Sequence, residues 1–153
     1  MTDQYISEIP ERIEFLKKYE IKDTRYAKSL KTHPVTPRKI RANAGAYFDF
    51  KDMHIMNAHI SEMKPGLVGK KHRHSNEAII YILKGTGYSI FQKEGEPEER
   101  IDWAEGDIMA IPAFFWHQHF NTDPDNTARY LAIVNVPLMQ KMGLFVVDQF
   151  VQK

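Results

Sequence analysis

Short apolar runs separated by turns fill the chain from residue 46 onward. The runs are rich in β-branched and aromatic residues, and glycines and prolines stand between them. They cover residues 46–50, 55–63, 77–83, 87–92, 107–111, 116–121 and 129–136. Such runs, bounded by turn residues, predict an all-β barrel or sandwich. The polar stretch 93–100, KEGEPEER, is predicted to be an exposed hairpin loop.

The N-terminal third has a different period. Over residues 7–19 the apolar residues have the i, i+4, i+7 spacing of an amphipathic helix, with Pro10 tolerated in its first turn. These apolar residues are Ile9, Ile13, Leu16 and Tyr19. A second helical stretch is predicted around residues 24–30, where the prolines that follow would force extended backbone.

Length and charge limit the possible architectures and partners. A chain of 153 residues has room for one well-buried core. We expect a helix and arm over residues 1–45 and a barrel over residues 46–153, in which residues 139–151 form a helix or a closing strand. The net charge of +1 gives no basic excess for nucleic acid. Without an apolar run of the roughly 20 residues that span a bilayer, we expect a cytoplasmic protein.

The candidate chemistry lies in the histidines. The sequence has no cysteine, so a metal would be bound by nitrogen and oxygen donors. His72 and His74 are separated by one residue, and on a strand they would point to the same face. Two imidazoles could therefore be presented to one ion.

Two motifs then resemble those of the cupin family. The first reads G-x5-HRH-x3-A-x6-G over residues 66–85, and the second reads G-x5-PAF-x2-H-x3-N over residues 106–121, with Phe114 in place of a usual glycine. The resemblance implies a single cupin β-barrel of six to eight strands, jelly-roll-like, with a short N-terminal helical arm. It also implies one divalent metal ion, bound by the residues His72, His74 and His117. In the alternative, these histidines are structural residues of a cupin that has lost its metal.

The position of the usual cupin carboxylate differs in this chain. Many cupins have a glutamate four residues after the second histidine, but here that residue is Ala78 and the glutamate is Glu77. A shift of one residue turns the side chain to the other face of a strand, so Glu77 would need a β-bulge to reach the ion. A three-histidine site and a bulged four-ligand site therefore both remain open.

Other residues near the motifs are candidates for roles in the pocket. His119 shares a face with His117 and is either a group that moves protons or binds substrate, or a structural histidine bonded to backbone. His59 lines the pocket or lies on the surface under the arm, depending on strand register. Arg73 and Gln118 should point away from the ion. Hydroxyls could come from Tyr81, Tyr88 and Tyr130.

A three-histidine site favours a substrate that brings its own negative oxygens. It resembles the site of gentisate and salicylate 1,2-dioxygenases, which share HRH followed by alanine and a motif like residues 116–119, WHQH. The resemblance implies a mononuclear non-haem Fe(II) dioxygenase acting on a small carboxylated phenol or enol, although those enzymes carry two cupin domains. The alternatives are a redox-neutral metal-dependent isomerase, lyase or decarboxylase, and a non-catalytic cupin that binds a small metabolite.

Cofactor and assembly follow in the same way. Fe(II) is the favoured ion, with Mn(II), Ni(II) or Zn(II) possible, because three imidazoles accept each of them. Cupins are commonly dimers whose N-terminal segments cross to the partner. We therefore expect a homodimer that binds a small-molecule substrate, with no nucleic acid and no membrane as partner.

Overall fold

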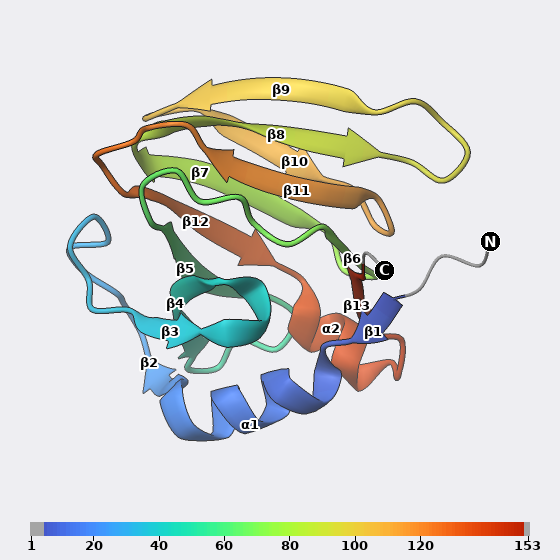
Figure 1. Cartoon of the computed structure of the whole chain (residues 1–153). Helices are drawn as coiled ribbons and strands as arrows, with labels where there is room; N and C mark the ends of the chain where they lie inside the picture. The colour runs from blue at the N-terminus through green and yellow to red at the C-terminus, as the bar shows by residue number, and fades with distance from the viewer. Residues whose placement is uncertain (1–4, 152–153) are drawn as a thin grey trace.

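The computed structural model describes residues 5–151, and its strands form two sheets (Figure 1). One sheet has six strands, in the order β1 (Tyr5–Ser7), β13 (Val147–Phe150), β6 (His72–His74), β11 (Trp116–Asn121), β8 (Thr86–Gln92) and β9 (Glu99–Ala104). The other has seven: β10 (Ile108–Ile111), β7 (Ala78–Lys84), β12 (Ala128–Val134), β5 (Asn57–Met63), β4 (Asn43–Phe50) and β2 (Ile21–Thr24), with β3 (Thr36–Arg38) also on β4. The predicted all-β fold is confirmed.

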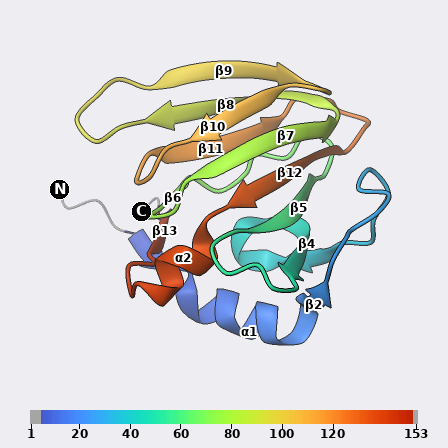
Figure 2. The same cartoon turned by 180° about the vertical axis from the view of Figure 1, so that it is seen from behind.

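Each predicted apolar run overlaps a strand, with bounds shifted by a few residues. The exposed hairpin loop is shorter than predicted, because the last two residues of the stretch 93–100 already belong to β9. The C-terminal stretch contains both of the predicted alternatives: the short helix α2 (Val136–Lys141) overlaps its start, and β13 closes the sheet beside β6. Figure 2 shows the barrel from behind, with α1 (Ile9–Tyr19) along its lower edge.

The main core lies between the two sheets. Along β7 the burial alternates, with Ala78, Ile80 and Ile82 buried inside and Ile79 and Tyr81 exposed on the outside. The inward residues pack with Trp103 and other apolar side chains of the facing sheet. Alternation of this kind is the direct result of the two-residue period of a strand.

A second apolar cluster lies on the outer face of the seven-stranded sheet. Phe48, Ile60 and Leu83 point outward there, and the arm residues Leu30 and Val35 cover them. Because this cover buries the apolar outer face of β5, the polar inner face of the same strand can line the interior. The arm thus decides the strand register that the sequence left open.

The helix α1 confirms the predicted helix, but the face it turns to the barrel differs from the apolar stripe. Arg12 and Phe15 are its buried residues, whereas Ile13 is 47% exposed and Tyr19 is 41% exposed. The helix covers a charged region of the barrel, and Glu8, just before it, is completely buried. An electrostatic contact, rather than apolar packing alone, therefore sets its orientation.

The second predicted helix, around residues 24–30, is wrong. The chain forms β2, which runs parallel to β4, and then an irregular segment. Ser29 has a φ value of 55°, a left-handed conformation that is incompatible with a right-handed helix. A helix there would also withdraw the cover from the outer face of the sheet.

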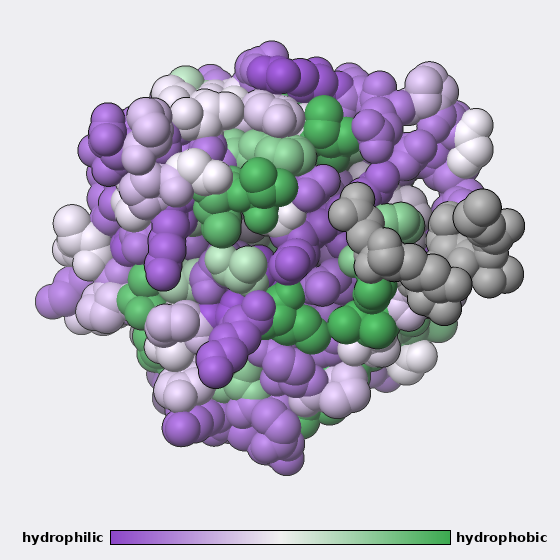
Figure 3. All heavy atoms as spheres, in the orientation of Figure 1, coloured by the Kyte–Doolittle hydropathy of each residue, from purple (hydrophilic) through white to green (hydrophobic). Residues whose placement is uncertain are grey.

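The surface is mixed in character. The face in Figure 3 is mostly hydrophilic, with a few hydrophobic residues near its middle. Within residues 5–151, neither helix has the length and apolar character needed to cross a membrane.

Candidate metal centre

Three histidines from two neighbouring strands meet inside the barrel. His72 and His74 lie on β6, and His117 lies on β11 directly opposite His72 in the antiparallel register. Their available ligand atoms all lie within 4.8 Å of one another. This is the set predicted from the motifs, and the side-chain alternation of β6 brings its two members to one face.

Each of the three imidazoles is oriented by a hydrogen bond to a backbone carbonyl. The bonds run from Nδ1 of His72 to Lys70 O (2.8 Å), of His74 to Asn76 O (2.7 Å) and of His117 to Phe115 O (2.9 Å). A carbonyl can only accept, so Nδ1 carries the proton in each ring and Nε2 keeps its lone pair. This outer bond is the usual way to fix a metal-binding histidine.

The rings are neutral as well as oriented. Burial lowers the pKa of His74 to about 4, and it lowers the pKa values of His72 and His117 well below the ordinary value. The positive charge of Arg41 acts in the same direction on all three. A neutral imidazole is the form that binds a metal ion.

The usual carboxylate position is occupied by Ala78, which lines the cavity. Glu77 is exposed, and its backbone N–H donates to Asn135 Oδ1 at 2.9 Å. The register around Ala78 is regular, with Ile111 and Val134 as its partners, so no bulge turns Glu77 inward. The four-ligand alternative is therefore wrong, and within residues 5–151 the ligand group is made of histidines alone.

The donor set fits a divalent ion. Three nitrogen donors are held by the backbone, they are uncharged, and they face a cavity of about 60 Å³. Nitrogen-only sites with open positions suit Fe(II), Mn(II), Ni(II) and Zn(II) alike. The geometry supports a divalent metal without selecting among these ions.

His119 lies beside the three ligands, on the same face of β11. Its Nδ1 is 2.7 Å from Ser89 Oγ, and Trp103 Nε1 donates to that same oxygen at 2.9 Å. Burial lowers the pKa of His119 to about 3, with Arg41 as the next cause. His119 is thus a neutral ring held by a side-chain hydroxyl, and not by backbone.

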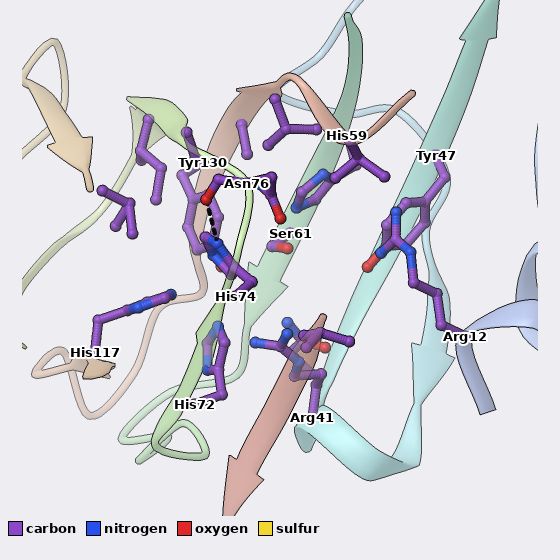
Figure 4. A pocket seen from close by; sticks show the side chains of 18 of the residues that line it. Arg12, Arg41, Tyr47, His59, Ser61, His72, His74, Asn76, His117 and Tyr130 are labelled. Carbon is purple, nitrogen blue, oxygen red and sulfur yellow. Dashed lines mark hydrogen bonds between the residues drawn. The ribbon is translucent and has the colours of Figure 1, made fainter. Parts of the chain in front are cut away.

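His59 lines the cavity from the opposite wall, on β5 (Figure 4). Its ring stacks on Tyr47, with 4.8 Å between centroids and 15° between planes. Burial lowers its pKa well below the ordinary value, and Arg12 adds to the effect. Within residues 5–151, Nδ1 of this buried ring has no hydrogen-bond partner.

Three arginines that the sequence did not single out also line the cavity. Arg38 is the last residue of β3, Arg41 is the last residue of the 3₁₀ helix Lys39–Arg41 that follows, and Arg12 comes from α1. Glu8 and Glu11 form ion pairs with Arg38 and Arg41. In the sequence, the spacing of four residues between Glu8 and Arg12 places both on one side of the helix, and it could have indicated that this side of α1 is charged.

The side chains predicted to turn away from the ion do so. The guanidinium of Arg73 lies over the indole ring of Trp116, 4.5 Å from its centroid. The side-chain amide of Gln118 donates to Gly69 O at 2.8 Å. Neither residue lines the cavity.

Only one of the three candidate tyrosines reaches the site. Tyr130 lines the cavity, and burial raises its pKa. Tyr81 is 44% exposed on the outer face of its sheet. Tyr88 stacks on Phe120, with 4.3 Å between ring centroids, and does not line the cavity.

A comparison with family models decides the family. Residues 59–134 match the model of the Cupin domain, and this range includes all three histidines. The chain carries a cupin domain. Phe114 occupies the position where the cupin motif usually has glycine, and it has a φ of 62°, in the region that favours glycine. Its N–H donates to His74 O at 2.8 Å.

The cupin domain is similar in sequence to several dioxygenases. It is 27% identical over 74 residues to 5-aminosalicylate 1,2-dioxygenase of Comamonas sp, which is 48% of this chain and 18% of that protein. It is 30% identical over 90 residues to 1-hydroxy-2-naphthoate 1,2-dioxygenase of Nocardioides sp., 59% of this chain and 22% of that protein. With acireductone dioxygenase of Danio rerio it shares 28% over 97 residues, 63% of this chain and 53% of that protein. The chain spans only part of the length of each of these relatives.

Solved structures give the same fold. Salicylate 1,2-dioxygenase from Pseudoaminobacter salicylatoxidans, as its gentisate adduct, matches 80% of this chain and 32% of that chain, with a TM-score of 0.63 and 12% identity. At this identity the match shows a shared cupin architecture.

Proposed function

We propose that this protein is a mononuclear non-haem Fe(II) dioxygenase that acts on a small carboxylated phenol or enol. The observation that carries the proposal is the ligand set: three neutral imidazoles, of which His72 and His117 are buried and His74 is half-buried, with alanine at the carboxylate position. With no negative ligand from the protein, the full charge of the ion is available to an anionic substrate. Bound Fe(II) would supply a Lewis acid for the substrate oxygens and the redox chemistry with O₂.

The relatives support the same reaction class. Two of them are named for hydroxylated aromatic carboxylic acids, 5-aminosalicylate and 1-hydroxy-2-naphthoate, and the third is named for an acireductone. All three are dioxygenases by name. Because the chain covers only part of each relative, the substrate of this protein is a proposal drawn from the site and not a property taken from them.

We propose that His119 and His59 are the catalytic residues of the pocket. Ser89 accepts the indole N–H of Trp103, which leaves its own hydroxyl proton free to be donated to Nδ1 of His119. In that arrangement Nε2 of His119 carries a proton and can donate to a substrate oxygen. His59, stacked on Tyr47, would position the ring or enol plane of the substrate from the other wall.

The second candidate is a redox-neutral isomerase, lyase or decarboxylase. The neutral His119, beside the three ligands, favours it, because such a ring could move a proton while the ion polarises a carbonyl. This activity would not require oxygen and would be retained with Zn(II) or Mn(II). A binding cupin would bind ligands with neither activity.

Oxygen uptake separates these functions. The protein would be reconstituted with Fe(II) without oxygen and then mixed with oxygenated buffer containing 5-aminosalicylate, gentisate, 1-hydroxy-2-naphthoate or an acireductone. The proposal predicts uptake with at least one of them, loss of uptake in His74→Ala, and full uptake in His54→Ala, whose histidine is exposed. Turnover that is equal without oxygen would support the second candidate, and binding without turnover would support the third.

We further propose a homodimer and a cytoplasmic location. The arm that was expected to cross to a partner packs against its own barrel, through β2 and β3 on β4. The exposed apolar outer face of β10, β7 and β12 instead supports self-association: Ile79, Tyr81, Ile108 and Ile133 are 38% to 69% exposed there. A molar mass from light scattering of twice the chain mass of 17.9 kDa would support the dimer. Ile79→Lys should then give the mass of a monomer.

A further inference from the structure

Within residues 5–151, Arg12 is a buried cation to which no carboxylate is directly paired. Its side chain reaches the cavity from α1 and the residue is only 9% exposed. Within residues 5–151, no carboxylate or other acceptor forms a hydrogen bond or ion pair with its guanidinium, and its Nε is buried without a partner. A guanidinium has five N–H donors and remains charged in proteins, so burying it unpaired is costly.

The neighbouring charges do not compensate it. Arg38 donates to Glu11 at 2.7 Å, and Arg41 Nε donates to Glu8 Oε2 at 2.6 Å. Both carboxylates are therefore used by Arg38 and Arg41. The charge of Glu20 also acts on Arg12, but within residues 5–151 Glu20 forms no ion pair with its guanidinium. Arg12 is thus left without a bonded anion, next to a site whose metal ligands are neutral.

The ring contacts of Arg12 position it but do not replace an anion. Its guanidinium carbon lies 5.4 Å from the ring centroid of Tyr47 and 5.5 Å from that of Phe145. Such cation–π contacts orient the planar group and leave its N–H donors free. Burial lowers the pKa of Arg12, and the opposing influences of Tyr47 and Glu20 do not cancel this effect.

Arg41 approaches the same space from another element. Figure 4 shows its guanidinium turned toward the three histidines, while Arg12 enters beside Tyr47. Glu8 accepts from Nε of Arg41, and within residues 5–151 the terminal nitrogens of Arg41 form no hydrogen bond. Two guanidinium groups from distant segments therefore present donors to one cavity opposite the metal ligands.

We propose that Arg12, together with Arg41, forms a carboxylate-binding subsite, and that α1 is the element that selects acids. Both arginines line the same cavity as the three histidines, so a carboxylate bound there would lie beside the metal site. This subsite would bind the carboxylate of the proposed substrate. That the bound acid is the substrate rests on the proposed function. Binding of the carboxylate itself requires neither metal nor oxygen.

The test uses simple carboxylates as probes. Binding of acetate and benzoate to the full chain, with and without metal, would be measured by calorimetry beside the uncharged amides acetamide and benzamide. The proposal predicts that at least one acid binds about tenfold or more tightly than its amide, in the metal-free protein as well. Equal affinities for acid and amide would overturn it.

Two variants assign the subsite to Arg12. Arg12→Met keeps an apolar stem over the two rings and removes the charge, and it should weaken acid binding about tenfold or more while leaving amide binding unchanged. Arg25→Met is the matched control, because Arg25 is exposed and pairs with Asp52 on the surface. It should bind the acids like the wild type.

Stability distinguishes a binding role from a structural one. Because Arg12 is unpaired, Arg12→Met should unfold at the same temperature as the wild type or a higher one, and added benzoate should raise the midpoint of the wild type only. A large loss of stability together with unchanged acid binding would assign Arg12 to the fold. Acid binding without any oxygen uptake would leave the subsite in place and reject the dioxygenase alone.

Discussion

The two walls of the cavity are built in opposite ways. The histidine wall, on β6 and β11, is uncharged, and each ligand ring is held by a carbonyl two residues away in the sequence. The arginine wall is charged and is assembled from α1 and from the segment around the 3₁₀ helix, with ion pairs that join residues about 30 positions apart. Every ligand ring of the histidine wall donates from Nδ1 to a backbone carbonyl. In the arginine wall, within residues 5–151, the guanidinium of Arg12 has no paired carboxylate. The difference suits a metal site with fixed, neutral ligands on one side and a binding site for an anion on the other.

The largest effect expected from this contrast is the pH dependence of stability. The pKa of His74 is lowered to about 4 and that of His119 to about 3, against 6.5 for an ordinary histidine. Below pH 6.5 the unfolded chain binds protons at these sites and the folded chain does not, so stability falls as the pH falls toward 4. Each histidine contributes about 1.4 kcal/mol per pH unit in that window.

Urea unfolding of the metal-free protein at pH 7.5, 6.5 and 5.5 would measure this loss. Little change is expected between the two higher values and a steep fall below them. The arginines do not titrate in this range, so a free energy of unfolding that stays constant down to pH 5 would mean that the buried histidine wall is not as described.

Within the arginine wall, Glu8 and Arg12 should respond in opposite directions. Glu8 is completely buried and pairs with both Arg38 and Arg41. Glu8→Gln would remove the carboxylate partner of the half-buried Arg41 and leave the buried Arg38 with Glu11 alone, and it should lower the free energy of unfolding by about 3 kcal/mol. Glu11→Gln, at a partly exposed carboxylate, is the milder control. Equal small losses in the two variants would contradict the distinction.

Ala78→Glu would add a negative charge to the metal site from β7, on the sheet that faces the histidine wall. The new side chain would extend into the cavity at the position where many cupins have a carboxylate, so metal affinity should rise. Turnover of a carboxylated substrate should fall about tenfold, because the added charge opposes the anion. Glu77→Ala should leave both quantities unchanged, since Glu77 is exposed. Metal titration and oxygen uptake on the two variants would measure this.

The smallest expected effect concerns the turn that precedes β11. Phe114 has a φ of 62° and is 51% exposed. Phe114→Gly should remove left-handed strain of about 1 kcal/mol while keeping the backbone bond to His74. Thermal unfolding should show a slightly raised midpoint. A clearly lowered midpoint would mean that the aromatic ring packs more strongly than its exposure suggests.

The difference between the walls also explains what the sequence could predict. The ligands His72, His74 and His117 follow from strand alternation and local motifs, and the strands follow from the two-residue period. The face of α1 was not predictable from its apolar spacing, because Arg12 is turned inward by contacts with residues far along the chain. Residues 24–30 were misassigned because their role as a cover for Phe48 and Ile60 exists only in the folded barrel.

The orientation of His59 illustrates the same limit. Its strand can place either of two faces inside, and only the cover over Ile60 decides between them. The location of His59 in the cavity is therefore a result of the fold, while its catalytic role and that of His119 remain proposals.

The most direct test of the three-histidine site is the metal content of the protein purified without added metal. Elemental analysis should find one divalent ion per chain, and iron if the proposed reaction is correct. His72→Ala should weaken metal binding by more than about 100-fold, and His54→Ala should retain the ion. A wild-type protein that cannot bind one equivalent of any divalent ion, or a His72→Ala protein that binds it equally well, would contradict the account.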